Sequence, residues 1–133
     1  MSPLSFLVDT DCVIDHFNRI RTASERIKKA ASEGLGLSVI SLAELSEGIF
    51  FSRDPVASDA QVQEFMGGIT LIGISGETCR IFGRLRGELR PRGRLVPDFD
   101  LMIAATAIEH NLTLLSNNRR HFENIPGLRL ESI

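Results

Sequence analysis

The sequence predicts a three-layer α/β fold, with a mainly parallel central sheet flanked by helices. Short apolar runs alternate along the 133 residues with segments whose apolar residues recur at helical spacing. Strands that alternate with helices in this way are typical of parallel sheets covered on both faces. A chain of this length is sufficient to bury one core. No linker, repeat or low-complexity stretch interrupts the chain, so we expect a single domain over residues 1–133.

The first half of the chain contains two of the predicted strands, each followed by helices. The short apolar run at 4–8 indicates a buried strand, as does the run at 37–40. Helical spacing is found at 12–17 and at 22–33, where Gly34 and Gly36 are suitable helix-ending residues. A third helix is expected from Ser41 to about Phe51.

The second half predicts three further helices and three further strands. A proline is suited to the start of a helix, which we place at Pro55, and Asn111 is suited to a left-handed helix end. Cys12 and Cys79 are expected to be small core residues. The expected helices are 55–65, 75–90 and 97–110, and the expected strands are 69–74, 112–115 and 128–130.

Composition and charge restrict the cellular setting more than the activity. The net charge is −2, which favours neither a nucleic-acid partner nor its absence. There is no secretory signal pattern and no apolar run of the roughly 18 residues that a membrane span needs. Two cysteines far apart in sequence suggest no disulfide framework. We therefore expect a cytoplasmic protein without a membrane partner.

Acidic residues stand where the predicted strands end or helices begin. Asp9 follows the first strand, Glu44 follows the second, and Asp100 lies in the first turn of the helix that precedes the fourth. The carboxyl ends of parallel strands and the amino ends of the intervening helices share one edge of the sheet. Carboxylates brought together there would repel one another unless a hard divalent cation lay between them. The pattern therefore predicts a Mg²⁺ or Mn²⁺ site and a metal-dependent nuclease.

Each acid also has a purely structural interpretation. Asp9 could cap the following helix, and Glu44 lies three residues after Ser41, which is the spacing of a capping box. Asp100 would be stabilised by the helix dipole alone, and Asp98 after Pro97 is a natural N-cap. The joint placement of the acids is therefore stronger evidence than any one of them.

An arginine-rich segment from Arg80 to Arg94 allows two interpretations. Arginine binds phosphate through both charge and paired hydrogen bonds, which favours RNA phosphate contacts. A solvated helix face is the alternative interpretation, since Arg84 can pair with Glu88. The arginines that we assign as candidate phosphate contacts are Arg86, Arg90, Arg92 and Arg94.

Two other families with acids after a first strand fit the sequence less well. The segment Asp9 to Val13 matches the nucleophile loop of haloacid-dehalogenase-like phosphatases, and response-regulator receivers also begin with such acids. Both families use a lysine late in the chain. The only lysines here are Lys28 and Lys29, so a Mg²⁺-dependent phosphatase remains the weaker alternative.

Taken together, these residues resemble a PIN domain, and specifically the VapC toxins of bacterial VapBC toxin–antitoxin pairs. The resemblance spans nearly the whole chain and is most specific at 100–107. Its other matching segments are 7–15, 38–45, 112–122 and 125–128.

The resemblance implies a metal-dependent endoribonuclease toxin that cleaves structured RNA with metal-activated water. It assigns Asp9, Glu44 and Asp100 to the Mg²⁺ or Mn²⁺ site. Asn118 occupies the position of a fourth acid found in many PIN domains, and Asp98 could compensate for the missing charge. Hydroxyls of Thr10 and Ser116 are expected to orient the site.

The resemblance also implies partners, namely an RNA substrate, a small antitoxin that blocks the site, and a second copy of the chain in a homodimer. A PIN-like module that binds RNA or protein without a toxin role is the other alternative, which the intact acids disfavour.

Overall fold

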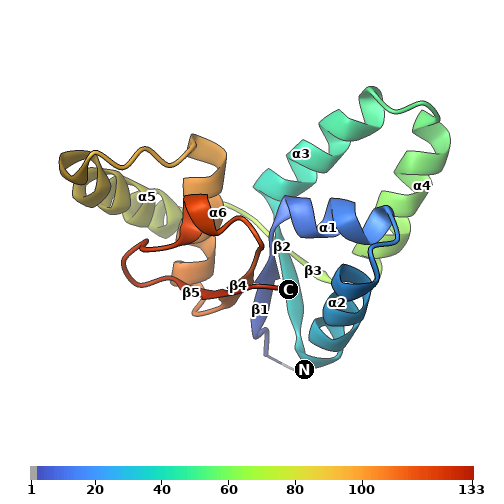
Figure 1. Cartoon of the computed structure of the whole chain (residues 1–133), viewed down its shortest axis with the longest axis horizontal. Coiled ribbons are helices and arrows are strands. Elements are labelled where there is room, and N and C mark those ends of the chain that lie inside the picture. The colour runs from blue at the N-terminus through green and yellow to red at the C-terminus, as the bar shows by residue number, and fades with distance from the viewer. Residues whose placement is uncertain (1–2) are drawn as a thin grey trace.

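The computed structural model describes residues 3–133, so residues 1 and 2 of the predicted domain lie outside the described part. Within it, five strands form one sheet with the order β3-β2-β1-β4-β5, and every neighbouring pair is parallel (Figure 1). The strands are β1 (Phe6–Val8), β2 (Leu35–Ser38), β3 (Thr70–Ile72), β4 (Thr113–Leu115) and β5 (Arg129–Glu131). The predicted parallel α/β architecture is therefore confirmed.

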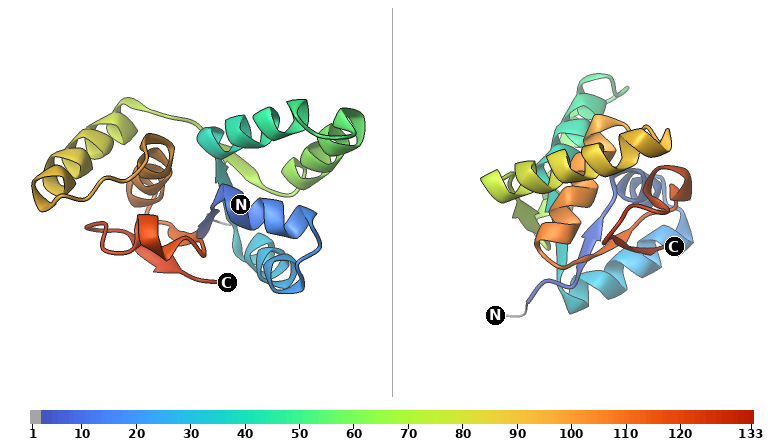
Figure 2. Two further views of the ribbon diagram at one scale, coloured as in Figure 1. Left: turned by 45° about the horizontal axis from the view of Figure 1, so that its top comes forward. Right: turned by 90° about the vertical axis from the view of Figure 1, so that its left-hand side faces the viewer.

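Helices cover both faces of this sheet. Figure 1 shows α1 to α4 on one side of the strands and α5 and α6 on the other, and Figure 2 shows α5 crossing α6. The helices are α1 (Thr10–Phe17), α2 (Arg21–Glu33), α3 (Val39–Phe50), α4 (Pro55–Met66), α5 (Gly76–Leu89), α6 (Asp98–Glu109) and α7 (Arg119–Phe122), with a 3-10 turn, η1 (Arg90–Arg92), after α5. Within residues 3–133, none of these helices is long and apolar enough to cross a membrane.

Alternation along the strands divides the core into two clusters, one on each face of the sheet. Leu7 and Leu114 pack against α5 and α6 together with Leu85. Val8 and Leu37 face the other way and pack against α1 to α4. Because successive strand residues point to opposite faces, short strands of three or four residues are sufficient to anchor both helical layers.

The chain order makes a reversal point beside β1. The first three strands add in one direction, β1 to β2 to β3, and β4 then pairs with the opposite side of β1. In open parallel sheets, a crevice forms at such a reversal, outside the carboxyl ends of the strands. Asp9 directly follows β1 and Ser116 directly follows β4, so this crevice receives polar residues from both strands.

Three local predictions are wrong. The second strand ends at Ser38 rather than residue 40, because the Ser38 hydroxyl caps α3 by accepting from the Ile40 amide. Cys79 is exposed, whereas Cys12 is buried as expected, because Thr78 and Ile81 occupy the inward positions of α5. The N-cap of α6 is Pro97, which places Asp98 inside the first turn.

Two helix ends follow the predicted chemistry. Gly34 ends α2 with φ +105°, and a Cβ there would collide with the Pro3 carbonyl oxygen. Asn111 adopts the left-handed conformation after α6, with φ 57°. Both turns direct the chain straight into the following strand, β2 or β4, so they set where those strands begin.

Candidate active site

The crevice at the reversal point is an open pocket of about 500 Å³. It lies between the start of α1, the middle of α3, the start of α6 and the turn before α7. All three acids predicted to form the site line it, as do the two auxiliary residues Asp98 and Asn118. The full lining is Asp9, Thr10, Asp11, Glu44, Pro97, Asp98, Phe99, Asp100, Asn118 and His121.

Asp9 is the most buried acid of the site, with 3% of its surface exposed. One carboxylate oxygen accepts from the Thr10 amide at 2.8 Å, so Asp9 also caps α1. The other oxygen accepts from the Ser116 hydroxyl at 2.8 Å. Both carboxylate oxygens of Asp9 are therefore oriented by hydrogen bonds, one from the Thr10 amide after β1 and one from the Ser116 hydroxyl after β4.

Burial and neighbouring acids make the Asp9 charge unfavourable. The pKa of Asp9 is raised to about 7, chiefly by desolvation and in smaller part by the charges of Asp11 and Asp100, while the hydrogen bonds from Ser116 and Thr10 lower it. Such a carboxylate is stabilised by a nearby cation, which offsets both the desolvation and the repulsion.

Glu44 lies in the middle of α3 and is not part of a capping box. Since α3 begins at Val39, Ser41 is inside the helix and cannot act as its N-cap. Glu44 instead accepts from the Thr10 hydroxyl at 2.7 Å, and Ser41 Oγ lies 2.9 Å from the same hydroxyl. Burial raises the pKa of Glu44, the Thr10 bond lowers it, and the charge of Asp100 raises it.

His121 contacts both Asp100 and Asn118. It was not among the site residues predicted from the sequence. His121 Nδ1 lies 2.5 Å from Asp100 Oδ2 and 2.8 Å from Asn118 Nδ2. The backbone N–H of Asn118 donates to Ser116 Oγ at 3.0 Å. The turn after β4 therefore contacts two of the acids, Asp9 through Ser116 and Asp100 through His121.

The four candidate arginines are not equivalent. Arg86 bonds Asp98 at 2.5 Å and the Val96 carbonyl at 2.9 Å. Arg94 bonds the Glu123 carbonyl at 2.9 Å. Arg90 and Arg92 are exposed in the η1 turn. Two of the four therefore brace neighbouring segments, and two face solvent.

The donor chemistry of this pocket fits a hard divalent cation. Asp9, Glu44, Asp100 and Asn118, whose side chains carry carboxylate or amide oxygens, line one cavity, and the pKa values of Asp9 and Glu44 are raised by burial and by like charges. Among the described residues, no three His, Cys, Asp or Glu side chains are already grouped to hold a metal ion. Glu44 and Asp100 are bonded instead to Thr10 and His121.

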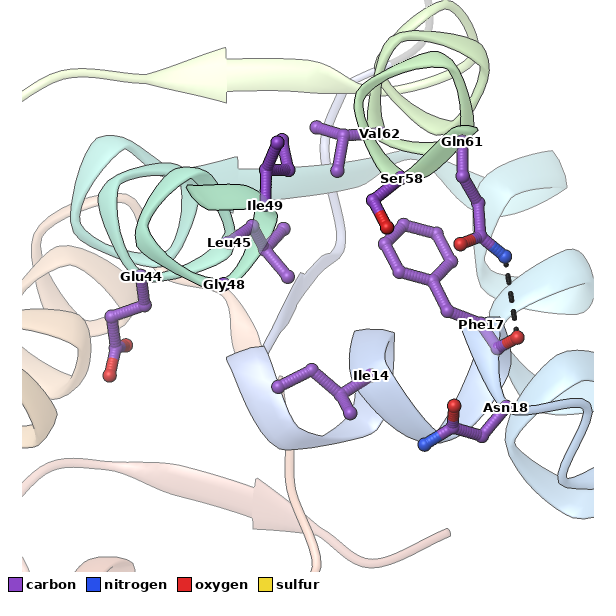
Figure 3. A pocket seen from close by; sticks show the side chains of 10 residues that line it. All are labelled: Ile14, Phe17, Asn18, Glu44, Leu45, Gly48, Ile49, Ser58, Gln61 and Val62. Atoms are coloured by element: carbon purple, nitrogen blue, oxygen red, sulfur yellow. Dashed lines mark hydrogen bonds between the residues drawn. The ribbon is translucent and has the colours of Figure 1, made fainter. Parts of the chain in front are cut away.

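A second pocket of about 280 Å³ adjoins the first on the other side of Glu44 (Figure 3). Its walls come from α1, α3 and α4, and Gln61 bonds the Phe17 carbonyl across it. Ile14, Leu45 and Val62 make it largely apolar, and Glu44 is the only acid that residues 3–133 contribute to its lining. Among the described residues, this second pocket therefore has no group of carboxylates that could bind a cation, and the candidate cation site is in the first pocket.

Comparison with known proteins agrees with this fold. A family model for the PIN domain matches residues 6–128. The chain is 34% identical over 103 residues to ribonuclease VapC2 of Rickettsia felis, covering 77% of each chain. It is 32% identical over 129 residues to the tRNA(fMet)-specific endonuclease VapC of Shigella flexneri, covering 96% of this chain and 97% of the relative.

A solved structure is similar over the whole fold. The crystal structure of VapBC2 from Rickettsia felis, bound to a DNA fragment from their promoter, matches with a TM-score of 0.90 and 28% identity. The match covers 96% of this chain and 98% of that one.

The parallel sheet and the acidic pocket at its reversal point define a class of α/β proteins with a carboxylate-lined crevice. With the family match, they identify the particular family: the chain belongs to the PIN domain family and, within it, to the VapC ribonucleases.

Proposed function

We propose that this protein is a Mg²⁺- or Mn²⁺-dependent endoribonuclease that acts as the toxin of a type II toxin–antitoxin pair in the cytoplasm. The observation that carries the proposal is the pocket at the reversal point, where Asp9, Glu44 and Asp100 arrive from three different elements. Its membership of the VapC ribonucleases supports the reaction class.

In this proposal Asp9, Glu44 and Asp100 hold the cation, and Asp98 and Asn118 are auxiliary oxygen donors at the pocket wall. A cation held by these residues would supply an acidified water and charge neutralisation at the phosphate, which is the chemistry that in-line hydrolysis requires. Exposed Arg90 and Arg92 are the better candidates for holding phosphates outside the pocket, and Arg86 and Arg94 support the segments beside it.

Hydroxyl and imidazole groups keep these carboxylates in place. Ser116 holds Asp9, Thr10 holds Glu44, and His121 holds Asp100. Each donor is attached to a strand end or a helix, so the acids are oriented before substrate binds. Such preorganisation reduces the entropy lost when substrate and cation assemble.

The proposed substrate is structured RNA, and the proposed partners are an antitoxin and a second copy of the chain. The relative from Shigella flexneri is named as a tRNA(fMet)-specific endonuclease, which supports a folded RNA. The Rickettsia felis structure contains VapBC2 on promoter DNA, which supports an antitoxin partner.

The direct test is cleavage of a folded RNA, such as a tRNA, by the purified chain. We expect cleavage with Mg²⁺ or Mn²⁺, none in EDTA, and loss of cleavage in Asp9→Asn, with Arg53→Gln as a surface control. Full cleavage in EDTA would refute the metal dependence. Tight RNA binding without cleavage by the metal-loaded protein would favour the non-enzymatic binding module.

The toxin role requires a separate test in bacteria. Expression of the chain alone should arrest growth, and Asp100→Asn at equal soluble level should not. Co-expression of a short gene from the adjacent reading frame should restore growth and yield a co-purifying complex. Harmless expression of active ribonuclease would contradict the toxin role while leaving the nuclease intact.

A further inference from the structure

Phe99 is an exposed aromatic residue inside the acidic pocket. It lies between Asp98 and Asp100 in the first turn of α6, and 52% of its surface is exposed. Leu101 and Ile103, further along the helix, are fully buried in the core. The helix therefore uses its buried face for packing and presents Phe99 to the pocket instead.

The environment of Phe99 differs from that of the other strongly exposed phenylalanines. Phe50 and Phe51 are 79% and 78% exposed at the end of α3, but their rings pack edge to face 5.3 Å apart, away from the acidic pocket. Within residues 3–133, no aromatic ring is paired with Phe99. Ligand-binding pockets commonly combine aromatic side chains with a few polar groups, and Phe99 is an aromatic residue of this acidic lining.

The charge of the pocket selects what Phe99 can contact. The acids Asp9, Asp11, Glu44, Asp98 and Asp100 line it, and no lysine or arginine of the described chain does. A phosphate entering without a cation would be repelled, whereas the flat uncharged face of a nucleobase would not. An aromatic ring is the side chain best suited to that face, because base stacking requires no charge.

The segment leading to Phe99 connects the pocket with positive charge. Arg90 and Arg92 are exposed in η1, and exposed Leu95 and Pro97 follow before the helix begins. In Figure 1 this stretch runs back from the far end of α5 to the start of α6. Arginines that precede an aromatic residue provide phosphate contacts and a stacking surface in the order that an unpaired stretch of a folded RNA needs.

The start of α6 is held rigidly. Arg86 from α5 bonds both the Asp98 carboxylate and the Val96 carbonyl, and Val96 is buried. The Phe99 ring is therefore presented from a fixed backbone, and little ordering of the chain is needed when a ligand stacks on it.

We propose that Phe99 is the stacking platform for a nucleobase of the RNA, adjacent to the phosphate that the proposed cation site would hold. This proposal rests on the proposed ribonuclease function and adds the residue that positions the substrate base. Phe99 touches the substrate without taking part in proton transfer or metal binding.

Replacement of Phe99 tests stacking separately from burial. Phe99→Ala should weaken RNA binding by about 5- to 150-fold, the range for loss of one base–aromatic stack. Phe99→Leu should remain weak because it restores apolar bulk without an aromatic face, and Phe99→Trp should bind at least as well as wild type. Phe51→Ala, an exposed ring outside the pocket, is the matched control and should bind normally. Equal binding by Phe99→Ala, Phe99→Leu and wild type would overturn the proposal.

Fluorescence supplies a readout that does not depend on cleavage. The chain has no Trp and no Tyr, so the Phe99→Trp variant carries a single indole fluorophore. A folded RNA with an unpaired loop should quench the emission of Phe99→Trp and leave that of the Phe51→Trp control unchanged. An abasic nucleotide at the stacked position should abolish the quenching. RNA that binds to Phe99→Trp without quenching its indole would refute base stacking, as would equal quenching of both variants.

These measurements separate the two claims. Cleavage by wild type together with unaltered binding by Phe99→Ala would remove only the stacking role. Quenching of the Phe99→Trp variant by RNA without metal-dependent cleavage by wild type would retain the base contact and remove the ribonuclease function.

Discussion

Burial of the Asp9 carboxylate makes the metal-free protein sensitive to pH. The pKa of Asp9 is raised to about 7 in the folded chain, mainly by desolvation, from an unfolded value of about 3.9. Between these values the folded state binds more protons than the unfolded state, so the free energy of unfolding decreases as pH rises. The raised pKa of Glu44 acts in the same direction.

We therefore predict that the protein in EDTA loses stability from about pH 4 to pH 7, by at most about 1.4 kcal/mol per pH unit from Asp9. Urea unfolding across this range measures the slope. Asp9→Asn should have a shallower slope, whereas Asp59→Asn, an acid on α4 outside the pocket, should follow wild type. A slope that Asp9→Asn leaves unchanged would show that this carboxyl is ionised normally.

His121 is a site residue that contacts one of the predicted metal-binding acids, Asp100. It lies between Asp100 and Asn118, with Nδ1 within 2.8 Å of both. Partners that orient ligating carboxylates are commonly required for metal affinity. We predict that His121→Phe weakens Mn²⁺ binding by about 10- to 100-fold.

Calorimetric titration measures this change. His121→Asn, whose side-chain nitrogen can replace Nδ1, should recover part of the affinity, and His110→Phe should bind Mn²⁺ as wild type does. Wild-type affinity in His121→Phe would mean that Asp100 needs no support from this ring.

The sequence allowed the acids to be placed but not this histidine. Asp9, Glu44 and Asp100 each lie near a recognisable strand end or helix start, and parallel sheets bring such positions to one edge. His121 is 21 residues from Asp100 and reaches it only through the α7 turn, where Asn118 caps the helix through the His121 amide. No spacing rule links the two residues.

Among the secondary-structure elements, the end of β2 sets where α3 begins, and therefore sets the position of Glu44 along that helix. The spacing Ser41 to Glu44 imitated a capping box, but Ser38 is the actual cap, and the β-branched pair Val39 and Ile40 lies in the helix rather than the strand. The Ser38 cap thus outweighed the strand propensity of this β-branched pair.

We predict that Ser38→Ala destabilises the protein by about 0.5–2 kcal/mol, the usual cost of losing an N-cap side chain. Chemical denaturation measures the difference, and Ser46→Ala on the exposed face of α3 is the control. Should Ser38→Ala and Ser46→Ala have equal stability, the hydroxyl bond to the Ile40 amide would contribute nothing.

The η1 turn gives a prediction for the arginines. In the double variant Arg90→Ala with Arg92→Ala, the plot of log RNA-binding constant against log salt concentration should be less steep, by about 0.7 in slope per lost phosphate contact. Because Arg94 bonds the Glu123 carbonyl, Arg94→Ala should instead lower the melting temperature. Filter binding at several salt concentrations measures the slope. An unchanged slope in the double variant would leave these arginines as a solvated surface.

At the scale of the whole molecule, the alternation of strands and helices was sufficient to predict a parallel three-layer fold. It was not sufficient to predict the strand order, because β1 pairs with β4, which lies near the other end of the chain. That pairing creates the crevice, so the convergence of the acids depends on a long-range contact.

If Asp9, Glu44 and Asp100 form one cation site, Mn²⁺ should stabilise the folded protein, and this stabilisation should depend on Asp9. Scanning calorimetry of wild type and Asp9→Asn at pH 8, each in EDTA and in Mn²⁺, measures both effects. Asp9→Asn removes a desolvated charge, so it should melt at an equal or higher temperature than wild type in EDTA. Mn²⁺ should raise the melting temperature of wild type only. If Mn²⁺ does not raise the melting temperature of wild type, or raises that of Asp9→Asn by the same amount, these acids do not form the cation site.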